Sequence, residues 1–149
     1  MNSSRLPGKV LASICGKPAL ELMIERLKTV EHIDNIIIAT TNNKVDDPIA
    51  SLANKLQVHC FRGSEENVLS RVLGAVREYS TDIIVQTTGD CPLIDPRIVS
   101  KVIETFFSEK VDYCSNIIER TYPIGMDVQV FSKSILEHVE QQTCAPEDL

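Results

Sequence analysis

At 149 residues the chain is long enough to bury one hydrophobic core but hardly two, so we expect a single domain. Hydrophobic residues make up 43% of the chain and charged residues 24%, which fits a globular protein and excludes a disordered or fibrous one. The net charge of -6 argues against an extended nucleic-acid surface, which needs a basic face. Small phosphorylated ligands need only a few local cations and remain allowed.

Targeting signals and cysteine frameworks are both absent from the sequence pattern. No apolar run approaches the roughly 20 residues that span a bilayer, and the N-terminus has no apolar signal-peptide core, so we expect a cytoplasmic protein without a membrane partner. The five cysteines are scattered and form no CxxC pair, which signals neither a disulfide framework nor a zinc site. We expect reduced thiols that are mostly buried at Cys15, Cys60, Cys91, Cys114 and Cys144.

The first half of the chain predicts helices that alternate with strands. Helices are indicated by apolar residues at intervals of three and four, and strands by short β-branched runs of the kind that parallel sheets cover on both faces. Asp46 and Asp47 before Pro48 are a favourable cap and first turn for the second helix. In order, we expect a helix over residues 16–30, a strand at 35–40, a helix from 48 to 56, a weak strand at 58–61 and a helix over 65–79.

The second half repeats the alternation and then changes character. We expect a strand at residues 82–87, a loop at 88–94, a helix that starts at 95–96, a strand at 111–116, a half-exposed strand at 125–131 and a last helix capped by Ser132. Strands and helices at this spacing predict an α/β fold with a three-layer, doubly wound, mostly parallel sheet and right-handed crossovers.

The loop after the second strong strand is the first candidate site. Ligands of open α/β sheets bind outside the carboxyl ends of the strands, where Gly89-Asp90-Cys91-Pro92 lies. Gly89 would let the backbone approach a ligand closely, and the Asp90 carboxylate could coordinate Mg²⁺ together with substrate phosphate oxygens. The alternative is that Asp90 is only a turn residue before Pro92.

The opening stretch is the second candidate site. Two hydroxyls and two cations lie around Pro7-Gly8, from Ser3, Ser4, Arg5 and Lys9. Such groups are suited to binding a polyphosphate. The GxxxxGK[ST] spacing of a Walker loop is absent. The alternative is a frayed basic N-terminus.

Taken together, these stretches resemble one family. In order, SSRLPGK, GKP-L---IERLK, IIIATT, FRGSEENVLSRV, GDCPLIDP and YPIGMDVQVFS are similar to the cytidylyltransferases of the spore coat polysaccharide biosynthesis protein F type. These enzymes are relatives of the CMP-N-acylneuraminate and CMP-Kdo synthetases. The resemblance covers nearly the whole chain, and it implies a fold like that of the nucleotide-diphospho-sugar transferases, which is Rossmann-like.

The resemblance implies a nucleotidyl transfer. A hydroxyl of an acidic or modified sugar would attack the α-phosphate of CTP, release pyrophosphate and form a CMP-sugar for polysaccharide biosynthesis. It implies that the loop matching Ser4, Arg5 and Lys9 holds the triphosphate, and that the aspartate matching Asp90 helps to bind Mg²⁺. Because such a reaction is catalysed by positioning and by neutralising phosphate charge, it needs no covalent nucleophile, and Cys91 is a small neighbour of Asp90.

Further candidates follow from the same resemblance. Arg62, Ser64, Asn67 and Arg71 match the stretch after the third strand, where Arg71 would face nucleotide and Asn67 sugar. A capped helix with solvated polar residues is the alternative. Asp127 alternates with Met126 and Val128 and would point into the sugar pocket, although a polar residue on a half-exposed strand needs no function.

The resemblance also bears on the ends of the chain. Family members carry an apolar strand ending in Gln-Ala-Arg before the opening loop and continue beyond the last helix. We therefore expect residues 1–149 to be a single incomplete domain that lacks its first strand, a fragment or internally initiated product whose function belongs more securely to its parent. Two other classes stay open: a non-catalytic nucleotide-binding or interaction module, and a glycosyltransferase of related fold, although the DxD pattern is absent. Related synthetases are often dimers, which leaves a homodimer open.

Overall fold

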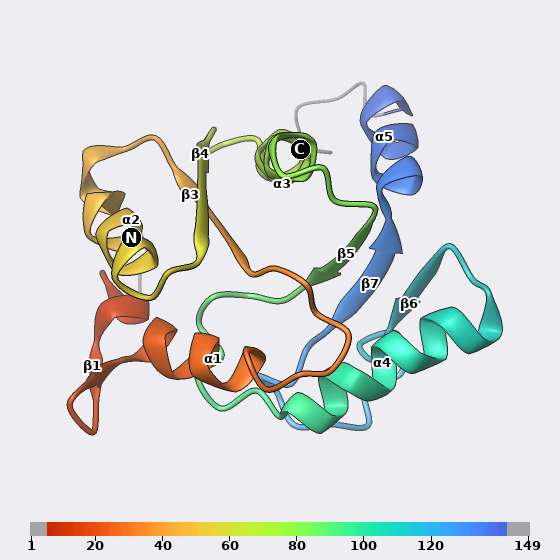
Figure 1. Cartoon of the computed structure of the whole chain (residues 1–149), viewed down its shortest axis with the longest axis horizontal. Helices are drawn as coiled ribbons and strands as arrows, with labels where there is room; N and C mark the ends of the chain where they lie inside the picture. Colours follow the sequence, from red (N-terminus) through yellow and green to blue (C-terminus); the bar gives the residue numbers. More distant parts are fainter. Residues whose placement is uncertain (1–5, 143–149) are drawn as a thin grey trace. The chain divides into compact units, whose positions relative to one another are not determined.

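The computed structural model describes residues 6–142, in which helices alternate with strands (Figure 1). This alternation confirms the predicted α/β class. The elements are, in chain order, η1 (Lys9–Leu11), β1 (Ser13–Ile14), β2 (Lys17–Pro18), α1 (Ala19–Leu27), β3 (Ile37–Thr41), η2 (Lys44–Asp46), α2 (Asp47–Lys55), β4 (His59–Gly63), α3 (Val68–Glu78), β5 (Ile83–Gln86), α4 (Pro96–Glu109), β6 (Tyr113–Ser115), β7 (Gln129–Ser132) and α5 (Lys133–Gln142).

The strands form three sheets. β3 and β4 pair in parallel, with Ile37 opposite His59 and Thr41 opposite Gly63. A second sheet has the order β5-β7-β6, and β1 and β2 form an antiparallel hairpin. The parallel pair agrees with the sequence prediction, but the expected single sheet is divided, because no strand within residues 6–142 pairs with both β3 and β5.

The chain divides into two compact units. The first contains residues 6–36 and 85–130, and the second contains residues 37–84 and 131–142. The chain crosses from one unit to the other directly before β3, within β5 and within β7. In the second unit a buried cluster joins α3, β5, β7 and α5 through Leu73, Val76, Ile84, Phe131 and Leu136. In the first unit the side chains of Ile24, Ile94 and Ile103 are almost completely buried. Each unit therefore contains buried apolar side chains of its own.

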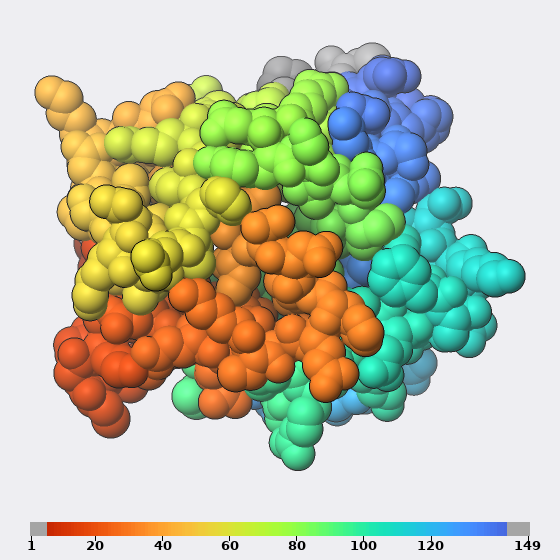
Figure 2. All heavy atoms as spheres, viewed as in Figure 1, coloured from red at the N-terminus to blue at the C-terminus, as the bar shows by residue number. Residues whose placement is uncertain are grey.

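The β1-β2 hairpin corrects the predicted start of the first helix. Cys15 and Gly16 both have positive φ, 51° and 84°, which is the two-residue geometry that reverses the chain tightly between antiparallel strands. Helix α1 consequently begins at Ala19 rather than at Gly16. The exposed hairpin projects at the edge of the space-filling view, in red (Figure 2).

Side-chain caps begin three of the helices. The Asn67 Oδ1 accepts a hydrogen bond from the Ser70 amide (2.7 Å), so α3 begins at Val68, three residues after the predicted start. The Asp95 Oδ1 accepts one from the Arg97 amide (2.9 Å), as Asp95-Pro96 predicted for α4. Ser132 caps α5, as predicted, by accepting a hydrogen bond at Oγ from the Ile135 amide (3.3 Å).

The cysteines and the helix lengths bear on two further expectations. Cys15, Cys60, Cys91 and Cys114 are free thiols, but Cys15 is exposed and the other three are half-buried, so the expectation of mostly buried thiols was wrong. Cys144 lies outside the described residues. Within residues 6–142, no helix combines the length and the apolar character that crossing a membrane requires.

Candidate active site

The two candidate loops of the first unit meet at one ion pair. The Lys9 ammonium in η1 donates a hydrogen bond to the Asp90 Oδ2 in the loop after β5, across 81 positions of sequence. The two side chains are 36% and 37% exposed, so solvent and ligands can reach both charges. The structure thereby brings together two of the residues predicted from sequence. Ser4 and Arg5, the other predicted members of the opening loop, lie outside the described residues.

The backbone around Gly8 directs the Lys9 side chain. Gly8 has φ 71°, a left-handed conformation that glycine adopts without a steric penalty, and it precedes the short helix η1. The Lys9 amide donates to the Leu6 carbonyl (3.2 Å), and the Leu11 amide donates to the Gly8 carbonyl (2.8 Å). Pro7 and Gly8 therefore form a tight turn from which Lys9 reaches Asp90.

Asp90 is held in its ionised form. The hydrogen bond from Lys9 is the main cause that lowers the pKa of the Asp90 carboxyl below its usual value, partial burial opposes it, and Thr88 contributes a further lowering. An ionised carboxylate with an exposed surface is the ligand type that Mg²⁺ prefers, since the ion takes one or two carboxylates and completes its shell with phosphate oxygens and water. Asp90 therefore fits as one ligand of a substrate-linked Mg²⁺ site. No cluster of three metal-ligating side chains occurs in the part of the chain that the structure describes.

The residues next to Asp90 in the loop are small: Thr88, Gly89 and Cys91. The Cys91 thiol lies 3.1 Å from the Thr88 hydroxyl and 3.9 Å from the Asp90 Oδ1, so it supports the loop as a small neighbour. A Cβ added at Gly89 would lie 3.8 Å from Leu20, which is an ordinary contact. The packing of the protein therefore does not itself require glycine at position 89, and its role in the approach of a ligand stays a prediction.

Asp127, the predicted sugar-facing residue, is paired in the first unit with an arginine that the sequence reading missed. Arg120 donates to both carboxylate oxygens of Asp127, at 2.8 and 3.2 Å. A bidentate pair of this kind fixes the plane of the carboxylate. Between them the chain turns through Gly125, whose φ is 97°. The seven-residue spacing of two opposite charges around Pro123 and Gly125 was the available signal.

Asn67 and Arg71 belong to the second unit. The Asn67 side-chain oxygen caps α3, which agrees with the alternative of a capped helix and leaves its NH₂ group as a donor. Arg71 donates from Nη1 to the Ser64 carbonyl, while its Nε is buried without a hydrogen-bond partner. The structure holds both residues at the start of α3, and their predicted ligand contacts remain predictions.

Arg62 has a structural role. Its Nε donates to the Thr41 carbonyl (2.9 Å), Nη2 to the Asn43 carbonyl (2.7 Å) and Nη1 to the Asp47 carboxylate (2.6 Å). These three contacts connect the ends of β3 and β4 with the start of α2. All three guanidinium nitrogens thus donate hydrogen bonds within the second unit.

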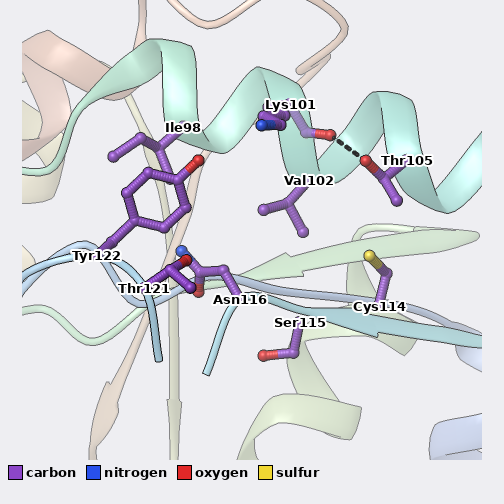
Figure 3. A pocket seen from close by; sticks show the side chains of 9 residues that line it. All are labelled: Ile98, Lys101, Val102, Thr105, Cys114, Ser115, Asn116, Thr121 and Tyr122. Atoms are coloured by element: carbon purple, nitrogen blue, oxygen red, sulfur yellow. Dashed lines mark hydrogen bonds between the residues drawn. The ribbon is translucent and has the colours of Figure 1, made fainter. Parts of the chain in front are cut away.

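A separate hollow of about 210 Å³ lies in the first unit between α4, β6 and the loop that follows β6 (Figure 3). The side-chain amide of Asn116, which lines it, forms a hydrogen bond at each polar atom: Nδ2 donates to the Met126 carbonyl and Oδ1 accepts from the Val128 amide. The other lining residues are Ile98, Lys101, Val102, Thr105, Cys114, Ser115, Thr121 and Tyr122. None of the predicted site residues within residues 6–142 lines this hollow.

Comparison with known proteins places these features in a family. The cytidylyltransferase family model matches residues 1–143. An uncharacterized protein of Methanocaldococcus jannaschii is 42% identical over 137 residues, covering 91% of this chain and 54% of the relative. The spore coat polysaccharide biosynthesis protein SpsF of Bacillus subtilis is 31% identical over 140 residues, covering 91% and 57%. The chain thus spans a little more than half the length of these relatives.

Solved structures agree with the sequence comparison. A cytidylyltransferase from Leptospira borgpetersenii superposes with a TM-score of 0.94 at 36% identity, covering 99% of this chain and 63% of that one. A CMP:2-keto-3-deoxy-manno-octonic acid synthetase complexed with CTP superposes with a TM-score of 0.73 at 19% identity, covering 98% and 76%, and shows the shared fold alone. With a family model matched from residue 1 to residue 143, this chain belongs to the cytidylyltransferase family.

Proposed function

We propose that the chain carries the triphosphate-binding and metal-binding part of a CTP-dependent enzyme that transfers CMP to an acidic or modified sugar for surface polysaccharide biosynthesis. The observation that carries the proposal is the exposed Lys9–Asp90 pair, which joins the opening loop to the loop after β5. Membership of the cytidylyltransferase family supports the reaction class, and the likeness to SpsF supports the polysaccharide pathway.

The reaction needs positioning and charge neutralisation. An oxygen of a sugar hydroxyl attacks the α-phosphorus of CTP and forms a new P–O bond, the bond from that phosphorus to the β-phosphate breaks, and pyrophosphate leaves with the electron pair. The hydroxyl proton passes to solvent. Because negative charge is spread over phosphate oxygens throughout, cations fixed in advance around the triphosphate stabilise the transition state most.

Lys9 and Asp90 would exchange partners when CTP binds. In the structure each charge neutralises the other. A triphosphate offers Lys9 anionic oxygens, and Asp90 is then released to hold a magnesium ion, which when bound would neutralise phosphate charge. Arg5 and Ser4 would add contacts to the same phosphates, and Gly89 would let the loop approach them closely.

The remaining assignments concern the nucleoside and the sugar. Arg71 would contribute to nucleotide binding from the start of α3, and the free NH₂ group of Asn67 would donate to a sugar hydroxyl. Asp127, oriented by Arg120, would accept a hydrogen bond from the sugar. We place the enzyme in the cytoplasm, where CTP is supplied, and propose that it forms a homodimer.

Calorimetry and pyrophosphate release test the proposal. We expect the chain to bind CTP in the presence of Mg²⁺, more weakly without it, and to release pyrophosphate when acidic sugars are added. Binding without release would contradict the transferase proposal for this chain and identify a nucleotide-binding module. A chain that binds a nucleotide-sugar but not CTP would be a glycosyltransferase of the same fold.

A further inference from the structure

The loop that carries Asp90 is anchored to α1 at its far end. The Arg26 Nε donates a hydrogen bond of 2.6 Å to the Ile94 main-chain carbonyl, across 68 positions of sequence. The Ile94 side chain is completely buried. Ile94 is therefore held both by the packing of its side chain and by the hydrogen bond to its main-chain carbonyl. Hydrogen bonds from charged donors are roughly twice as strong as neutral ones. Arg26 therefore holds the end of the loop through a strong contact.

The same loop is held from a second segment of the first unit. The Asp95 amide donates to the Met126 sulfur at 3.3 Å, and a Cβ added at Gly125 would lie 4.0 Å from the Cys91 sulfur. Leu20 of α1 approaches the loop again at Gly89. Residues 88–95 are thus supported by α1 and by the segment before β7, and Asp90 extends from this supported loop toward Lys9.

The contacts of Arg26 differ from those of Arg77, an arginine on helix α3. Among the described residues it forms no ion pair within 4.0 Å, whereas Arg77 on α3 pairs with Glu137 and Glu140. Its specific contact is the loop carbonyl, and its charge acts on Asp95, the residue that caps α4 directly after the loop. A cation placed in this way restrains where the loop ends and how α4 begins.

We propose that Arg26 is a positioning residue of the active site, which fixes residues 88–95 so that Asp90 meets the triphosphate and its metal in one orientation. This inference rests on the function proposed above. Met126 has a smaller part in the same task, because its thioether is a weak acceptor. Arg26 itself touches neither substrate nor metal.

Amide hydrogen exchange followed by NMR tests the restraint without any activity. The reporters are the amides of Ile94, which donates to the Cys91 carbonyl, and of Asp95. In Arg26→Met we expect their exchange to rise about tenfold relative to the native chain, with α1 and α4 unchanged. Arg26→Lys, which can still reach the carbonyl, should give an intermediate rise, and Met126→Leu a smaller one.

The matched control is Arg77→Met, which loses two ion pairs but no loop contact. It should leave both reporter amides unchanged. If Arg26→Met does not fold, Arg26→Lys and Met126→Leu decide the question alone. Unchanged reporter amides in the folded variants, or a rise shared evenly with α1 and α4, would overturn the positioning role and leave Arg26 a merely structural residue.

Nucleotide binding separates this inference from the proposed function. If the native chain binds CTP with Mg²⁺, Arg26→Met should weaken that binding several-fold, because the Asp90 carboxylate would no longer be held in position for the metal. The effect should be smaller when Mg²⁺ is absent. An equal loss with and without Mg²⁺ would contradict a role through Asp90. If the native chain binds no CTP, the proposed function fails, while the exchange experiment still decides whether Arg26 fixes the loop.

Discussion

A buried charge network in the second unit and an exposed ion pair in the first unit use charged side chains in opposite ways. In the second unit the buried carboxylate of Asp46 accepts hydrogen bonds from the hydroxyls of Thr40 and Thr41 and from the Thr41 amide, and Arg62 spreads its guanidinium over three acceptors. In the first unit Lys9 and Asp90 pair with each other at the surface. Charges used in the first way are committed to the fold, whereas those used in the second way are available to a ligand.

The difference has an energetic basis. Removing one partner from a buried hydrogen-bonded group leaves the others unsatisfied and costs about 1–3 kcal/mol for each group. An exposed ion pair contributes only about 0–1 kcal/mol, because water solvates both charges when it opens. The Lys9–Asp90 pair can therefore open for a ligand at little cost, and the Asp46 network cannot.

Replacing Asp46 should have the largest effect on stability. Asp46→Ala removes the acceptor for two threonine hydroxyls and one amide, at 2.9, 2.6 and 3.2 Å, inside the protein. We expect the free energy of unfolding to fall by about 2–4 kcal/mol, measured by urea denaturation, with CTP binding unchanged in the folded fraction. Asp46→Asn, which keeps one acceptor oxygen, should cost less. A variant as stable as the native chain would remove Asp46 from the scaffold.

Replacing Asp90 should instead reduce activity strongly and change stability little. Asp90→Asn keeps the size of the side chain and one oxygen but removes the charge, so we expect Mg²⁺-dependent pyrophosphate release to fall about 100-fold while the free energy of unfolding changes by less than about 1 kcal/mol. Asp34→Asn, an exposed carboxylate of the same unit, is the matched control and should change neither quantity. Full activity of Asp90→Asn would assign Asp90 to the turn before Pro92 instead.

Replacing Lys9 should have a smaller effect than replacing Asp90, and its effect on stability should depend on pH. Because the hydrogen bond from Lys9 is the main cause that lowers the pKa of Asp90, Lys9→Met should raise that pKa toward 3.8, as an NMR titration of the carboxyl would show. A lowered carboxyl pKa stabilises the fold above the unfolded value of about 3.8, and this contribution disappears as the pH falls through the lowered pKa. The stability difference between the two chains should thus be present at neutral pH and vanish in acid.

Binding gives the second readout for Lys9. We expect the affinity for CTP to fall about tenfold in Lys9→Met, because one cation is lost from the triphosphate site. Lys17→Met breaks a comparable exposed pair with Glu25 (2.5 Å) in the same unit and serves as the control. Equal effects of the two variants on CTP affinity would show that Lys9 acts only through the net charge of the unit.

Much of the fold was predictable because its signals are local. Apolar periodicity and capping residues predicted the principal helices, and Asp95 and Ser132 cap theirs as expected. The β1-β2 hairpin was missed because strands of two residues have no period to detect and because its turn places Cys15, a residue type that rarely adopts positive φ, beside Gly16. The division into three sheets depends on pairings between distant segments, which no local pattern encodes.

The site was predictable only in part, for the same reason. Lys9 and Asp90 were identified by residue type and by their loops, but their direct pairing across the chain was not. Arg26 and Met126 were missed because Arg26 contacts a main-chain carbonyl and Met126 a main-chain amide. Such contacts cannot be predicted from the pattern of side-chain types. The candidate residues could be named from sequence, whereas the contacts that support their loop required the structure.

Asn67 should show the smallest effect and tests the boundary between scaffold and site. Asn67→Ala removes the cap of α3, so the free energy of unfolding should fall by about 1 kcal/mol in urea denaturation. Asn67→Asp keeps the accepting oxygen and should restore stability, but it lacks the NH₂ donor proposed to meet the sugar, so the KM for the sugar should stay raised in both variants. If Asn67→Asp restores the KM together with the stability, Asn67 belongs to the scaffold alone, with Arg62 and Asp46.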